Sequence, residues 1–223
     1  MKNNFFLLLG ILGLLFTSCE QPKKGKLAYV GVKIETSYDD DGKLKIDTLR
    51  HKIPEFSLMN QDGKFVTQDD MMGQVYVADF FFTTCPSICK TMTGNMVELQ
   101  RMLQGQEGFR ILSHSVNPEY DTPEVLKDYA DRMGASTANW DLLTGERDVI
   151  YSLGLKGYFS EAEESELAPG GFLHTENFVL VDRHGYIRSR LDEFGNIKAV
   201  YNGTDIEEVK LLYKDIKTLL KEK

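Results

Sequence analysis

The 223-residue chain has few cysteines, no apolar segment of membrane-spanning length and no concentrated positive charge. The apolar run near its amino terminus, residues 5–16, is too short for a transmembrane helix, which needs about 20 residues. The formal net charge is −8, and residues 23–26 form only a short basic segment rather than a basic stripe. Nucleic acid is therefore not an expected partner. The sequence contains no internal repeat, and its length suits one well-filled domain with short extensions.

The amino terminus has the pattern of an export signal. A lysine at position 2, the apolar run 5–16 and two small residues precede Cys19. This arrangement resembles a bacterial lipoprotein signal, in which residues 1–18 are removed and Cys19 becomes the lipidated first residue. Phe16 stands where such signals usually have leucine, so a plain secretory signal is the alternative. We expect an extracytoplasmic protein, anchored by Cys19 to a membrane of a bacterial cell envelope.

The cysteine count supports the same location. Of the three cysteines, lipidation would use Cys19 and leave only Cys85 and Cys89 in the folded part. A location outside the cytoplasm permits these two to form a disulfide bond. It also suits copper traffic, which takes place largely outside the cytoplasmic membrane.

The segment 85–89, Cys-Pro-Ser-Ile-Cys, is the most informative part of the chain. It follows a β-branched and aromatic run, residues 75–82, that predicts a buried strand, and apolar residues at helical spacing come after it. Two thiols four residues apart at the start of a helix have Cβ atoms about 5–6 Å apart, so they can close a disulfide or hold one soft metal ion. The helix amino terminus also favours the thiolate. We interpret Cys85 and Cys89 as the functional site, with an inert structural disulfide as the alternative.

The order of the expected elements indicates a thioredoxin-like α/β fold, with a central mixed sheet flanked by helices. Residues 19–50 are expected to form a tether and a short hairpin, with alternating strands at 27–34 and 43–49 around an acidic turn at 39–42, ahead of one domain over residues 51–223. The expected elements of that domain are two short strands within 56–66, a strand at 75–82, a helix at 89–103, a strand at 110–116, helices at 123–132 and 146–153, a mobile loop at 161–171, a hairpin of 177–181 with 186–190, and a helix at 205–220.

Four segments resemble the Sco/SenC family, which is named for the synthesis of cytochrome c oxidase. They are residues 80–89 around the cysteines, 115–122 with its Asn-Pro-Glu sequence, 173–175 with its His-Thr step, and the hairpin 178–185. The resemblance covers about residues 52–221. It implies a thioredoxin-like fold and a role in supplying copper to, or reducing the cysteines of, the binuclear copper site of cytochrome c oxidase.

The resemblance also implies a copper site made by Cys85, Cys89 and His174. Soft thiolates suit Cu(I), and an added imidazole allows the same site to hold Cu(II). His174 follows Gly170-Gly171, and a ligand on a flexible segment can reach the metal and withdraw from it. The implied partners are the copper-site subunit of the oxidase or another cuproprotein, with a thioredoxin-like reductant as a further partner.

Two further positions, Asp79 and Asn117, lie near these motifs. Asp79 lies inside the apolar strand, six residues before Cys85, and resembles the buried aspartate of thioredoxin. Desolvation would raise its pKa and make it a proton acceptor during disulfide exchange, whereas a carboxylate satisfied by hydrogen bonds is the alternative. Asn117 stands where many members of the family have aspartate, which puts any acidic role of that position in doubt.

The remaining histidines and the helical methionines are expected to be structural. His184 falls in a turn and should be solvated, His51 precedes the compact part of the domain, which begins near residue 53, and His114 lies within a strand with an ambiguous role. Met92 and Met96 follow helical spacing and are expected in the core.

The leading functional interpretation is a membrane-anchored copper metallochaperone. The alternative is a thiol–disulfide oxidoreductase or peroxidase that uses Cys85 and Cys89 without metal. A third interpretation is a surface lipoprotein whose disulfide is incidental to its function.

Overall fold

The computed structural model of the protein describes residues 26–222. The predicted signal peptide and Cys19 lie outside the described residues. Within this part of the chain, no helix combines the length and the apolar character that crossing a bilayer requires.

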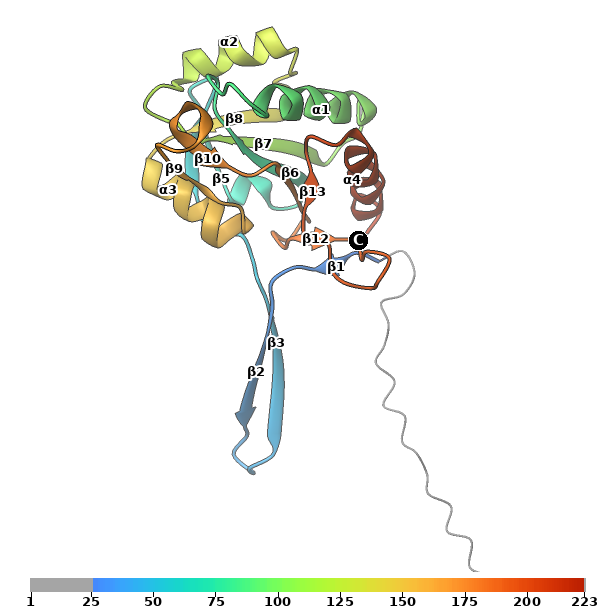
Figure 1. The fold of residues 1–223 in the computed structure, drawn as a ribbon. Helices are drawn as coiled ribbons and strands as arrows, with labels where there is room; N and C mark the ends of the chain where they lie inside the picture. Colours follow the sequence, from blue (N-terminus) through green and yellow to red (C-terminus); the bar gives the residue numbers. More distant parts are fainter. Residues whose placement is uncertain (1–25, 223) are drawn as a thin grey trace, which may run out of the picture.

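A seven-stranded mixed sheet forms the centre of the protein (Figure 1). Its spatial order is β13 (Tyr201–Asn202), β11 (Asn177–Val181), β6 (Val75–Phe81), β7 (Phe109–Ser115), β8 (Trp140–Thr144), β4 (Ser57–Asn60) and β5 (Phe65–Thr67). The central strands β6, β7 and β8 are parallel, and the outer strands join them antiparallel. All seven residues of β6 are buried, as its apolar sequence predicts for a strand covered on both faces.

Four α-helices surround this sheet. They are α1 (Cys89–Met102), α2 (Pro123–Met133), α3 (Arg147–Ser152), which continues as a π-helical segment over Leu153–Tyr158, and α4 (Ile206–Leu219). Two of the helices begin at polar caps: the Thr122 hydroxyl accepts a hydrogen bond from the Val125 amide, and the Asp205 carboxylate accepts one from the Glu207 amide. Helices α1 and α4 pack side by side (Figure 1). The predicted thioredoxin-like architecture and its helices are confirmed.

The structure corrects three details of the sequence-based expectation. Strand β8 was not expected, because its sequence is short and does not alternate. The expected loop 161–171 contains strand β9 (Ala162–Glu164), which pairs with β10 (Phe172–His174), since the return of the chain supplies a partner that local sequence cannot show. Strand β12 (Arg188–Ser189) pairs with β1 (Ala28–Tyr29), and only an isolated bridge, Val181 to Ile187, joins it to the preceding strand.

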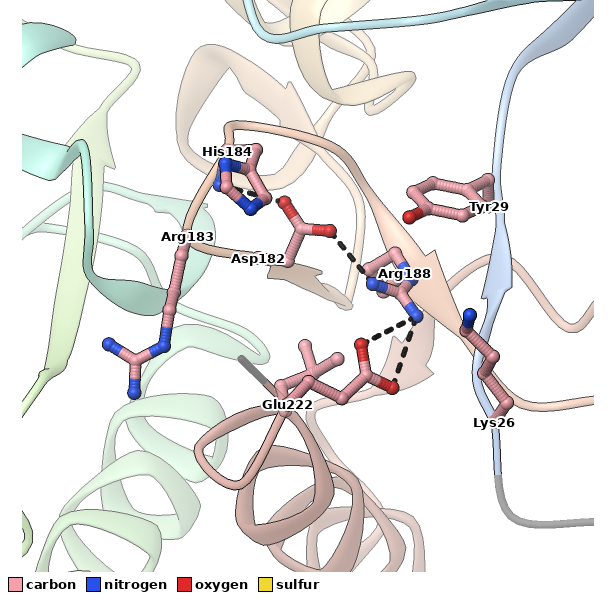
Figure 2. Close-up of a pocket in the computed structure, with 8 residues that line it drawn as sticks. Lys26, Tyr29, Asp182, Arg183, His184, Arg188 and Glu222 are labelled. Carbon is pink, nitrogen blue, oxygen red and sulfur yellow. Dashed lines mark hydrogen bonds and ion pairs between the residues drawn. The ribbon is translucent and has the colours of Figure 1, made fainter.

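The contact between β1 and β12 is held by a buried arginine. Arg188 is 2 % exposed, and its guanidinium donates to Asp182 at 2.8 Å and to the Leu27 carbonyl at 3.0 Å. Glu222, near the carboxyl end of the chain, reaches the same group at 3.1 Å. Figure 2 shows both carboxylates directed at the guanidinium, with Tyr29 lying beside it. A buried charge with two carboxylate partners fixes the segment that follows β1 to the body of the domain.

The predicted hairpin extension is present as β2 (Val32–Tyr38) and β3 (Leu44–Arg50), which pair antiparallel over all seven positions. The first strand lies later than the expected 27–34, because residues 28–29 belong to β1. The hairpin forms a two-stranded sheet of its own and projects away from the rest of the molecule (Figure 1). All seven residues of β2 are exposed.

Candidate metal centre

The two cysteines lie at the turn from β6 into α1. Cys89 is the first residue of the helix, and the Cys85 amide donates to the Phe82 carbonyl at 3.2 Å. The side chains are largely covered, with exposed fractions of 7 % for Cys85 and 1 % for Cys89. Both are free thiols. The site therefore lies at the carboxyl end of a central parallel strand, where open α/β sheets hold their ligands.

His174, the last residue of β10, brings its imidazole to the two sulfurs. Its Nε2 lies 3.0 Å from the Cys89 Sγ and 3.9 Å from the Cys85 Sγ. Its Nδ1 lies 3.1 Å from the Thr175 carbonyl, which can only accept, so Nδ1 carries a proton and Nε2 is the ring nitrogen that faces the sulfurs. The three donor atoms lie within 4.8 Å of one another and could hold a metal ion. Two thiols and one imidazole are a donor set that suits copper.

Packing of aromatic rings holds His174 in this position. The Phe82 ring lies 5.2 Å from the Phe172 ring and 5.8 Å from the His174 ring, measured between centroids. Gly170 approaches so closely that an added Cβ would lie 2.9 Å from the Pro86 Cδ and 3.0 Å from the Phe82 ring. The β9–β10 hairpin is therefore seated directly on the cysteine turn.

The two thiols differ in acidity. The hydrogen bond from Cys89, assisted by His174, lowers the pKa of Cys85 to about 4, although burial acts in the opposite direction. The same contact with the Cys85 thiolate, together with burial, raises the pKa of Cys89 above its ordinary value. At neutral pH, Cys85 is the thiolate and Cys89 keeps its proton.

Asp79 is buried beneath the turn, with an exposed fraction of 2 %. Its carboxylate accepts a hydrogen bond from the Ser113 hydroxyl at 2.5 Å, and that hydroxyl accepts one from the Trp140 indole at 2.9 Å. Burial raises the pKa of Asp79 to about 6, while Ser113 and the nearby His174 act to lower it. Among the described residues, no hydrogen bond joins Asp79 to either cysteine.

Another buried carboxylate next to the cysteine turn, Asp121, was not among the predicted site residues. It accepts hydrogen bonds from the Thr83 amide at 3.1 Å, from the Thr83 hydroxyl, and from the Ser115 hydroxyl at 2.5 Å. Asp121 is fully buried, and these contacts tie the chain just before Cys85 to the end of β7. Its position shortly after a predicted parallel strand was the available signal, because neighbouring parallel strands end at the same sheet edge. Asn117, where the family often has aspartate, accepts the Asp121 amide through its backbone carbonyl.

Among the described residues, none of the other histidines forms a hydrogen bond with either thiol. His51 contacts the Gly157 carbonyl, His114 is buried within β7, and His184 is exposed in its turn, as predicted. Met92 and Met96 are fully buried, which confirms their placement in the core.

The sequence matches a family model described as SCO1/SenC over residues 46–207, well over half of the chain. The chain belongs to the SCO1/SenC family. The matched region contains the two cysteines, the Asn-Pro-Glu segment and His174, so the family assignment and the site concern the same part of the molecule.

Three solved structures resemble the chain in both fold and sequence. A SCO1/SenC family lipoprotein from Bacillus anthracis str. Ames is 32 % identical with a TM-score of 0.66, and the match covers 76 % of this chain and 95 % of that one. BsSco, described with a disulfide switch and as a member of the Sco family of cytochrome c oxidase assembly proteins, is 33 % identical with a TM-score of 0.66, covering 78 % and 96 %. Bradyrhizobium japonicum ScoI with copper bound is 25 % identical with a TM-score of 0.58, covering 72 % and 96 %.

Proposed function

We propose that this protein is a copper metallochaperone that binds Cu(I) or Cu(II) through Cys85, Cys89 and His174. The observation that carries the proposal is the convergence of three donor atoms from distant parts of the chain within 4.8 Å. Their chemistry matches the metal, since thiolates favour Cu(I) and an added imidazole accommodates Cu(II). A relative of this fold has been solved with copper bound.

Each ligand has a distinct part in loading. Cys85 is already a thiolate, so it offers the first ligand without losing a proton. Cys89 releases its proton when the metal arrives, and the lone pair of His174 Nε2 completes the set. The ligand from β10 is the one on a separate element, so its withdrawal would open the site for stepwise transfer of copper to a recipient.

The same cysteines connect copper binding to redox state. Formation of a Cys85–Cys89 disulfide releases the one proton that Cys89 holds and passes two electrons to an oxidant such as a partner disulfide, and it removes both thiolate ligands. Copper occupancy and oxidation therefore exclude each other. A disulfide switch has been described in the relative BsSco, which supports this coupling.

We propose the binuclear copper site of cytochrome c oxidase as the destination of the metal, with a thioredoxin-like protein as a source of electrons. The support is family membership and the description of BsSco within a family of oxidase assembly proteins. We further propose that Cys19 carries a lipid that anchors the protein to a membrane. Its support is the sequence pattern and a lipoprotein among the relatives.

A second candidate function is metal-free thiol–disulfide exchange. The low pKa of Cys85 suits an attacking thiolate, and Cys89 would resolve the mixed disulfide. Asp79 would accept the proton that Cys89 loses in this step. In this function the imidazole is dispensable as a ligand.

Substitution of one histidine separates the two functions. His174→Ala should weaken Cu(I) binding by at least about 100-fold, measured by competition with a Cu(I) chelator on reduced protein, because one of three ligands is lost. The exposed His184→Ala is the matched control and should bind copper like the wild type. Unchanged copper affinity in His174→Ala, with normal exchange activity, would favour the oxidoreductase.

A further inference from the structure

The β2–β3 hairpin carries all but one of its exposed large apolar side chains on one face; the exception is Leu49, on the opposite face. Side chains of paired strands alternate between two faces, and the pairs Ile34 with Thr48 and Thr36 with Ile46 belong to the same face. We call this face the apolar hairpin face. Its apolar members are Val32, Ile34, Tyr38, Leu44 and Ile46, which are between 46 % and 75 % exposed. The opposite face is mostly polar, with Lys33, Glu35, Ser37, Lys45 and Asp47.

Nothing among the described residues covers this face. The hairpin is a separate two-stranded sheet, and such a hairpin is marginally stable in water by itself. Contiguous exposed apolar surface of this kind marks an interaction site. Strand β2 precedes residue 46, where the family match begins, so the metal centre does not account for it.

The base of the hairpin is held firmly, which fixes the direction in which it projects. The Arg50 guanidinium lies 4.1 Å from the centre of the Tyr29 ring, and Tyr29 in turn packs on Arg188. The His51 amide donates to the Gly31 carbonyl at 2.8 Å. The hairpin therefore projects from the domain rather than folding back on it (Figure 1), and the side chains of the apolar hairpin face are exposed.

The charge distribution along the hairpin identifies the occupant. The tip carries three consecutive aspartates, residues 39–41, against a single lysine, Lys43, and is net acidic, whereas Arg50 and Lys52 lie at the base. Three carboxylates at the tip oppose contact with an anionic bilayer. Two hairpins placed antiparallel would instead bring the acidic tip of each to the basic base of the other.

We propose that the apolar hairpin face packs against the same face of a second copy of this chain, with the two hairpins antiparallel about a two-fold axis. The contact is isologous, because the same residues serve both copies. Its centre buries Ile34 and Ile46, and Tyr38 of each copy lies toward Arg50 of the other, as a cation–π contact requires. The association uses no residue of the metal centre.

Oligomeric state tests the contact directly. Analytical ultracentrifugation of residues 26–223, which contain every element described above, should show a monomer–dimer equilibrium. Ile34→Glu should raise the dissociation constant at least about tenfold, because it places a charge in the apolar contact. Ser37→Glu adds the same charge to the opposite face of β2 and should leave the constant unchanged. A wild-type monomer up to high micromolar concentration, or equal effects of the two substitutions, would overturn the proposal.

Charge exchange tests the antiparallel orientation. Asp40→Lys and Arg50→Glu should each weaken the dimer, and the double variant should recover most of the loss. Additive losses in the double variant would contradict the orientation. Binding of the monomer to phosphatidylglycerol vesicles through Ile34 would instead assign the face to a membrane and overturn the proposal. Cys85→Ser should dimerise normally, so failure of the copper proposal is distinguishable from failure of this one.

Discussion

Two antiparallel hairpins that lie outside the central sheet, β9–β10 and β2–β3, differ in what they contact. The first has only three residues per strand, yet it places His174 within 3.0 Å of a cysteine sulfur, because Phe172 and Gly170 pack on the cysteine turn. The second is paired over seven positions and ends in open solvent. Strand length and pairing thus do not decide the role of a hairpin here. The role of each hairpin depends on whether core side chains pack against it.

The largest expected effect concerns the anchor of the cysteine turn. Asp121→Ala should lower the free energy of unfolding by about 3 kcal/mol, because three buried donors lose their acceptor. Urea denaturation of the reduced protein measures this. Asp47→Ala, which removes an exposed carboxylate from β3, is the control and should change stability by less than about 0.5 kcal/mol. Similar stability of both variants would mean that the turn does not depend on its buried carboxylate.

Asp79 provides a pH-dependent test beneath the same turn. Its pKa is raised to about 6 in the folded protein, so the neutral form stabilises the fold and this contribution is lost as pH rises through 6. Asp79→Asn should therefore be more stable than the wild type at pH 7, by up to about 3 kcal/mol, and the difference should shrink toward pH 4. Thermal and urea unfolding at both pH values measure it.

The same variant tests the proposed proton transfer. Asp79→Asn should slow thiol–disulfide exchange and leave copper affinity largely intact, because the side chain has no hydrogen bond to either cysteine. Equal exchange rates in variant and wild type would remove Asp79 from the mechanism.

Substitution of one glycine in each hairpin tests whether close packing on the cysteine turn distinguishes the two. Gly170 and Gly42 both have positive φ, 82° and 75°, but an added Cβ meets Pro86 and Phe82 at Gly170 and nothing within 4 Å at Gly42. Gly170→Ala should displace β10 and weaken Cu(I) binding by about tenfold or more. Gly42→Ala should cost about 1 kcal/mol of backbone strain at most and leave copper binding unchanged. Equal copper affinities of the Gly170→Ala and Gly42→Ala variants would show that copper binding does not require the close packing of this segment against Pro86.

The smallest effect is expected from paired truncations of apolar side chains. Phe172→Ala should lower the free energy of unfolding by about 1–2 kcal/mol, since the ring is partly buried against Phe82. Ile46→Ala should lower that of the monomer by less than about 0.5 kcal/mol, because its side chain is already 62 % exposed. The stability of Ile46→Ala should be measured at protein concentrations below the dimer dissociation constant, so that dimer formation does not contribute to it.

Local patterns in the sequence were sufficient for much of this protein. The apolar run of β6 and the helical spacing of Met92 and Met96 predicted the strand and helix that meet at the cysteines. A buried strand and an amphipathic helix each leave a pattern of apolar residues within a few positions of one another, so both can be read from local sequence. The hairpin β2–β3 was predictable for the same reason, as alternation around an acidic turn. The placement of His174 as a ligand came from resemblance to a family rather than from local pattern.

Only the tertiary structure decided how distant segments meet. The sequence by itself placed Cys85 and Cys89 in one short turn that leads into a helix, because only three residues separate them; the helix begins at Cys89, so the turn and not a helical face brings the side chains together. It did not show that Asp121 holds this turn, that β9 pairs with β10 to seat the imidazole, or that one hairpin face stays uncovered. The contact between Thr83 and Asp121 joins residues 38 positions apart, and the contact between Cys89 and His174 joins residues 85 apart; both exist only because the chain returns to the same sheet edge.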